Sequence, residues 1–140
     1  MFLGEVRHQL DEKKRIRIPT KFKKELGEDF AFVKGPGCIR VYPKHVIESQ
    51  IEMISSKLNP LNEAHSKFFR EYTRGIEFPT PDNQGRIVVP KAFLTHAQIE
   101  KDVITIGADK YLEIIPDREG DETDAILWET AMSELSKLIG

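Results

Sequence analysis

An internal repeat is the feature of this sequence that most constrains its fold. The segment DEKKRIRIP at residues 11–19 recurs as DNQGRIVVP at residues 82–90, an offset of 71 positions. The Asp, the Arg, the Ile that follows the Arg and the final Pro coincide, and Phe22 falls on Phe93 at the same offset. Because the same order of segments continues along each copy, we interpret the chain as a tandem duplication.

Each copy predicts the same series of elements. Two short strands flank a polar turn, a proline ends the second strand, a short helix follows, and two further strands complete the copy. The expected strands span 5–9, 15–18, 30–34 and 38–42 in the first copy, and 76–78, 86–89, 103–106 and 111–115 in the second. A copy of about 40 residues rarely buries enough apolar surface alone, so the two copies are expected to pair into one pseudo-symmetric unit.

Amphipathic helices are expected between the copies and after them. Apolar residues at helical spacing occupy 47–58, 61–72 and 128–139, and Asn59-Pro60 separates the first two helices. The predicted organisation is a first half at 1–58, a helical connection at 59–75, a second half at 76–116, and a linker with a C-terminal helix at 117–140. The amphipathic helices are candidates for packing between protomers.

Charge is distributed unevenly along the chain. Residues 1–24 hold eight basic and three acidic side chains, whereas residues 117–140 hold two basic and seven acidic ones. The net charge of the whole chain, −2, conceals this asymmetry. A basic segment of this kind fits a polyanion such as DNA, and an ordinary solvated surface with uneven charge is the alternative.

The repeated turn has residue types that suit recognition of a base. Asp accepts hydrogen bonds from turn N–H groups and can fix the orientation of the Arg four residues later. A guanidinium matches O6 and N7 of guanine, and lysines around the first turn can contact phosphates. The candidate DNA-binding residues are Asp11, Lys13, Lys14, Arg15, Arg17, Lys21, Asp82 and Arg86. The alternative is that each Asp–Arg pair only stabilises its turn.

Taken together with the opening MFLGE, the segment Lys21-Phe22 and the segment LEII at residues 112–115, both motifs resemble the MraZ family. The resemblance covers about residues 1–116. It implies a mostly β, α+β fold, in which tandem AbrB-like swapped hairpins form a pseudo-two-fold β-barrel with added amphipathic helices. It also implies that the Asp-x-x-x-Arg turn contacts DNA, through Asp11, Lys13 and Arg15 in the first copy and Asp82 and Arg86 in the second.

The resemblance further implies a bacterial transcriptional regulator. Such a protein is expected to form a ring-shaped homo-oligomer in the cytoplasm, associated with the nucleoid. It is expected to bind double-stranded DNA at tandem G-containing repeats upstream of the division and cell-wall gene cluster, and to repress that cluster, including its own gene. The alternative is an oligomeric AbrB-fold interaction module, or an antitoxin-like one, without sequence-specific DNA binding.

The first turn departs from the family pattern, which has Gly just before the Arg. The second copy keeps this residue as Gly85, whereas the first copy has Lys14. Gly at this point indicates a positive φ, where Lys would cost about 1 kcal/mol. Two hypotheses follow: either Lys14 is strained in a turn of the same shape, or the first turn is reshaped. In either case its ammonium can contact a phosphate.

Other chemistries find no support in the sequence. The single cysteine, Cys38, excludes an internal disulfide framework and a Cys-rich zinc site, and the four histidines lack paired metal-ligand spacing. No nucleophile elbow, phosphate-binding loop or dinucleotide fingerprint is present. We therefore expect no enzyme activity, cofactor or metal. No apolar run approaches the roughly 20 residues of a membrane span, and no secretory signal is recognisable.

Overall fold

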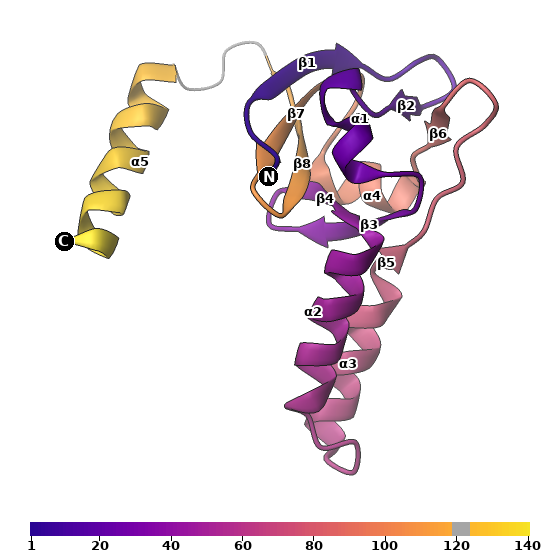
Figure 1. Cartoon of the computed structure of the whole chain (residues 1–140), viewed down its shortest axis with the longest axis vertical. Helices are drawn as coiled ribbons and strands as arrows, with labels where there is room; N and C mark the ends of the chain where they lie inside the picture. Colours follow the sequence, from indigo (N-terminus) through magenta and orange to yellow (C-terminus); the bar gives the residue numbers. More distant parts are fainter. Residues whose placement is uncertain (119–123) are drawn as a thin grey trace.

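The structure is a computed structural model, and it describes residues 1–118 and 124–140 (Figure 1). The strands are β1 (Glu5–Gln9), β2 (Arg15–Arg17), β3 (Phe30–Gly35), β4 (Cys38–Pro43), β5 (Ile76–Glu77), β6 (Arg86–Val88), β7 (Asp102–Ala108) and β8 (Tyr111–Pro116). The helices are α1 (Thr20–Leu26), α2 (Lys44–Ser56), α3 (Glu63–Arg74), α4 (Lys91–Ala97) and α5 (Asp124–Ile139). Most of the predicted linker, residues 119–123, lies outside the described residues.

Six strands form one antiparallel sheet in the order β1-β7-β8-β4-β3-β5. The first strand of each half pairs with the third strand of the other half: β1 with β7, and β5 with β3. The second strands, β2 and β6, pair with each other in a separate two-stranded ribbon. Backbone hydrogen bonds between strands therefore join the two halves into one unit.

The expectation of a closed β-barrel is wrong. The six-stranded sheet is open, with β1 and β5 at its edges. β5 has only two residues, and the β2–β6 ribbon does not join either edge, so no described strand connects them. Over the described residues the fold is mixed α/β, with a mostly antiparallel sheet and five helices, rather than mostly β. The AbrB-like swapped hairpin stays a prediction.

The core lies between the sheet, the ribbon and the two short helices. Each short helix begins directly after a proline and buries the apolar residues that the sequence spaced four apart, namely Phe22, Leu26, Phe93 and Ala97. On the ribbon, Ile16 and Ile87 are each 1% exposed and belong to the same cluster as Phe32 and Leu112 of the sheet. Burial of these two isoleucines fixes the inner face of the ribbon, and the polar side chains of its turns are left at the surface.

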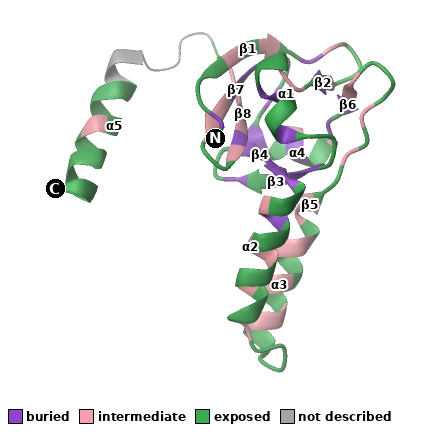
Figure 2. Cartoon of the chain, in the orientation of Figure 1, coloured by how far each residue is buried: buried purple, intermediate pink, exposed green. Residues whose placement is uncertain are grey.

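The helices α2 and α3 form an antiparallel hairpin that projects from the sheet (Figure 1). Only the base of this arm is buried, and most of its length is exposed or intermediate (Figure 2). Phe68 of α3 is 53% exposed although it stacks on Tyr72. On α5, Trp128 is 64% and Leu135 42% exposed. None of the described helices combines the length and apolarity needed to cross a membrane.

Candidate nucleic-acid interface

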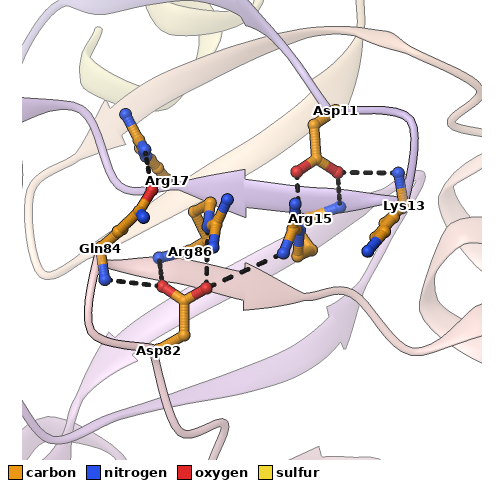
Figure 3. A network of polar contacts seen from close by, with 7 residues as sticks. All are labelled: Asp11, Lys13, Arg15, Arg17, Asp82, Gln84 and Arg86. Atoms are coloured by element: carbon orange, nitrogen blue, oxygen red, sulfur yellow. Dashed lines mark hydrogen bonds and ion pairs between the residues drawn. The ribbon is translucent and has the colours of Figure 1, made fainter.

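Asp11 organises the first turn through both carboxylate oxygens (Figure 3). Its Oδ1 accepts hydrogen bonds from the backbone N–H groups of Lys13 and Arg15, each at 2.9 Å. Its Oδ2 accepts from Nε of Arg15 at 2.7 Å. The backbone N–H of Arg15 is the main cause that holds the pKa of Asp11 below its ordinary value, so the carboxylate stays ionised.

Asp82 makes the same set of contacts in the second turn. Its Oδ1 accepts from the backbone N–H groups of Gln84 and Arg86, each at 2.9 Å, and its Oδ2 accepts from Nε of Arg86 at 2.8 Å. The pKa of Asp82 is also lowered, chiefly by the backbone N–H of Arg86. The repeated motif therefore forms the same three hydrogen bonds in both turns.

Lys14 occupies the same left-handed position as Gly85. Their φ angles are 58° and 76°, and each donates its backbone N–H to the carbonyl of the motif Asp, at 3.0 Å and 2.9 Å respectively. The hypothesis of a reshaped first turn is wrong, because the two turns share one geometry. The ammonium of Lys14 donates to the carbonyl oxygen of Glu100 at 2.6 Å, which ties the first turn to the second half.

The ribbon has one turn at each end and brings the Asp–Arg pairs of the two turns close together. β2 and β6 pair antiparallel with Ile16 opposite Ile87, so the turns are related by a local pseudo-two-fold. Nη1 of Arg15 lies 3.9 Å from Oδ2 of Asp82, the carboxylate of the other turn (Figure 3). Sequence separation gives no hint of this proximity, since the two motifs are 71 positions apart.

Each motif Arg is held through Nε by the Asp of its own turn, and its side chain is partly exposed. The side chains of Arg15 and Arg86 are 21% and 28% exposed. In the described part of the chain, the only hydrogen bonds that the Arg86 side chain makes run through Nε to its Asp, which leaves its terminal Nη groups as donors. Engagement of Nε by a carboxylate fixes the plane of the guanidinium, and a fixed plane favours recognition of a second planar acceptor pair.

The other predicted residues divide into those beside the turns and one apart from them. Lys13 and Arg17 are exposed on the turn and ribbon, and Nη2 of Arg17 lies 3.5 Å from the amide oxygen of Gln84. Lys21 is exposed on α1, but its ammonium lies beside Gly4, just before β1, and 5.7 Å from the ring of Phe22. The structure therefore groups seven of the eight candidates around the ribbon and places Lys21 next to the N-terminal segment.

Sequence reasoning missed Lys23. The Nζ atom of Lys23 lies 3.6 Å from the position that a Cβ atom would take at Gly85. Lys23 therefore lies beside the second turn, although it belongs to the first half. Only the uneven charge of residues 1–24 pointed in this direction. The proximity depends on how α1 packs, which no local pattern encodes.

Three of the four histidines, and the cysteine, have structural partners. Nε2 of His8 lies 2.7 Å from Oγ1 of Thr105, Nδ1 of His65 accepts from the backbone N–H of Asn59, and Nε2 of His96 lies 2.6 Å from the carbonyl oxygen of Gly35. Cys38 is buried and burial raises the pKa of its thiol to about 11, which suppresses the reactive thiolate. The described residues contain no His, Cys, Asp and Glu cluster able to hold a metal ion.

Comparison with known proteins agrees with this repeated architecture. The chain matches the family described as "MraZ protein, putative antitoxin-like" over residues 1–68 and 73–136. The chain belongs to the MraZ family. This family match spans both copies of the motif and both strands of the ribbon.

Several curated relatives carry the name Transcriptional regulator MraZ. The relative from Clostridium acetobutylicum is 40% identical over 118 residues, covering 81% of this chain and 80% of its own. The relative from Bacteroides thetaiotaomicron is 34% identical, covering 81% of this chain and 76% of its own. The relative from Pediococcus pentosaceus is 35% identical, covering 88% and 86%. The similarity therefore extends over most of the length of these relatives rather than over one short segment.

Proposed function

We propose that this chain is a DNA-binding transcriptional regulator that represses the division and cell-wall gene cluster. It does so by binding tandem G-containing promoter repeats through its two Asp-x-x-x-Arg turns. Membership of the MraZ family and the name of its relatives support the regulatory role. The observation that carries the DNA-binding site is the pair of Asp-oriented guanidinium groups side by side on one ribbon.

The chemistry of the ribbon fits the edge of a base pair. Each carboxylate engages Nε of its Arg. Both terminal nitrogens of Arg86 therefore remain to donate to O6 and N7 of guanine, whereas Nη1 of Arg15 also lies 3.9 Å from Asp82. Lys13 and Arg17 extend from the same turn and ribbon and are placed to contact phosphates. In this arrangement the arginines read the sequence, whereas the surrounding cations provide affinity that does not depend on sequence.

The oligomer contributes through avidity. One protomer offers two guanidinium groups, too few for tight binding of a short repeat, and linked copies on tandem repeats multiply such weak contacts. We propose a ring-like homo-oligomer that acts in the cytoplasm at the nucleoid. The exposed aromatic face of α3 around Phe68 is the surface we assign to contact between protomers.

Arg86→Ala tests the site directly. It should weaken binding to the promoter repeats by about 1–3 kcal/mol while leaving binding to unrelated duplexes nearly unchanged. Arg86→Lys, which keeps the charge but loses the planar donors, should be nearly as weak. Arg74→Ala is the matched control, because Arg74 is an exposed arginine of α3 that pairs with Glu71.

Gel-shift and fluorescence-anisotropy titrations on the promoter of the division cluster measure these affinities. Binding of Arg86→Ala at wild-type strength, with an unchanged melting temperature, would refute the role of the second turn. Failure of the wild type to bind any duplex would favour the alternative of an antitoxin-like interaction module, which the description of the family also mentions.

A further inference from the structure

The two turns differ in charge. The first is flanked by Lys13 and Lys14, whereas the second has Gln84 and Gly85 at the equivalent positions. If each turn meets DNA, as the proposed function requires, the second turn lacks a cation of its own for the phosphate beside its base contact.

The fold brings an ammonium group to the second turn from elsewhere. Lys23, in the last turn of α1, places Nζ 3.6 Å from the Cβ position of Gly85. The residue equivalent to Lys23 in the second half, at the offset of 71, is Leu94 of α4. Leu94 packs against the core, so α4 offers no ammonium at this position to the first turn.

These four positions form two complementary pairs. At the first turn the cation is on the turn itself, as Lys14, and the helix has Leu94. At the second turn the cation is Lys23 of α1, and the turn itself has Gly85, which has no side chain to occupy the space next to the ammonium. Each turn thereby has a lysine at or beside its positive-φ residue, although the sequence supplies it from different places; the ammonium of Lys14 donates to the carbonyl oxygen of Glu100, and that of Lys23 lies beside Gly85.

We propose that Lys23 is a phosphate-binding residue of the second turn and contacts the DNA backbone next to the base that Arg86 recognises. This inference rests on the proposed function and adds to it a residue from outside the repeated motif. Lys23 is exposed, and its side chain makes no hydrogen bond or ion pair with the described residues, so its ammonium is available to an anion. The ligand is a phosphodiester group of double-stranded DNA.

Salt dependence of DNA binding tests this assignment. The variant Lys23→Leu reproduces the residue that α4 has at this position. It should reduce the slope of log K against log salt concentration by about 0.9 for each protomer on the DNA. The loss should be the same for a promoter duplex and a scrambled one, since a phosphate contact reads no sequence. Lys57→Ala, a lysine at the far end of the arm, should leave the slope unchanged.

A second variant makes the test reciprocal. Lys23→Leu combined with Gly85→Lys gives the second turn the arrangement of the first, and it should restore the slope that Lys23→Leu loses. If Lys23→Leu binds DNA as tightly as the wild type and with the same slope of log K against log salt concentration, this inference is overturned while the proposed function stays intact. Absence of DNA binding by the wild type would overturn both. Thermal melting of each variant confirms that it is folded.

Discussion

Strain at Lys14 is the most sharply testable consequence of the structure. Its φ of 58° is a left-handed conformation, which costs a residue with a side chain about 1 kcal/mol relative to Gly. The same side chain donates from Nζ to the carbonyl oxygen of Glu100 at 2.6 Å, a contact of about 0.5–1.5 kcal/mol. The two effects oppose each other, so Lys14→Gly should leave the free energy of unfolding close to that of the wild type.

Comparison of Lys14→Gly with Lys14→Ala isolates the strain. Both variants lose the ammonium and its contact with Glu100, but only Gly adopts the positive φ without cost. We expect the Gly variant to be more stable by about 1 kcal/mol, which is a rise of roughly 3–5 °C in melting temperature for a domain of this size. Urea denaturation and differential scanning calorimetry measure the difference.

The mirror substitution provides the control. Gly85→Ala should destabilise the second turn by about the same amount, because Gly85 has the equivalent conformation with φ of 76°. Equal stability of the Gly and Ala variants at position 14, with Gly85→Ala destabilised, would refute the reasoning for the first turn. It would mean that the first turn relaxes when Lys14 is replaced.

Three further outcomes are expected. Asp82 has a lowered pKa, so its stabilising contribution is present above about pH 4 and is lost as the pH falls further; the difference in melting temperature between wild type and Asp82→Asn should shrink over that range. Gly107→Ala would drive Cβ into the backbone of Phe2 and Leu3, and it should lower the free energy of unfolding measured in urea by about 1–3 kcal/mol. Gly75→Ala is the control: its Cβ would come no closer than 3.6 Å to a neighbouring atom, so it should be nearly neutral. Phe68→Asp should shift the assembly toward smaller species in light scattering, since one interface residue can contribute about 2 kcal/mol, and a wild-type monomer at micromolar concentration would contradict the proposed interface.

Local patterns in the sequence were sufficient to predict the elements. The strand on each side of the turn, the proline after it and the apolar pair in the short helix depend on nearest neighbours along the chain, and each is present. The left-handed conformation of Lys14 was one of two hypotheses that the sequence left open, and Gly85 at the same place in the other copy favoured it. A repeat provides a second example of each local structure.

Long-range pairing was not predictable in the same way. Nothing in the sequence of β1 indicates that it joins β7 rather than its neighbour β2, or that β5 is too short to help close a barrel. The position of Lys23 beside Gly85 has the same origin, since it depends on the packing of one half against the other. Both features depend on contacts between the two halves. The periodicity of apolar residues indicates which face of an element is buried, but not which element packs against that face.

Exchange of strands between the halves explains why the two turns can act as one surface. β1 and β5 each complete the sheet of the opposite half, and β2 and β6 form a ribbon that neither half makes alone. A motion that separated the halves would break these backbone hydrogen bonds and expose Ile16 and Ile87, which are each 1% exposed. Rigid coupling therefore fixes the distance between the two guanidinium groups. Under the proposed function, this fixed spacing would let a pair of weak base contacts discriminate one short DNA sequence from another.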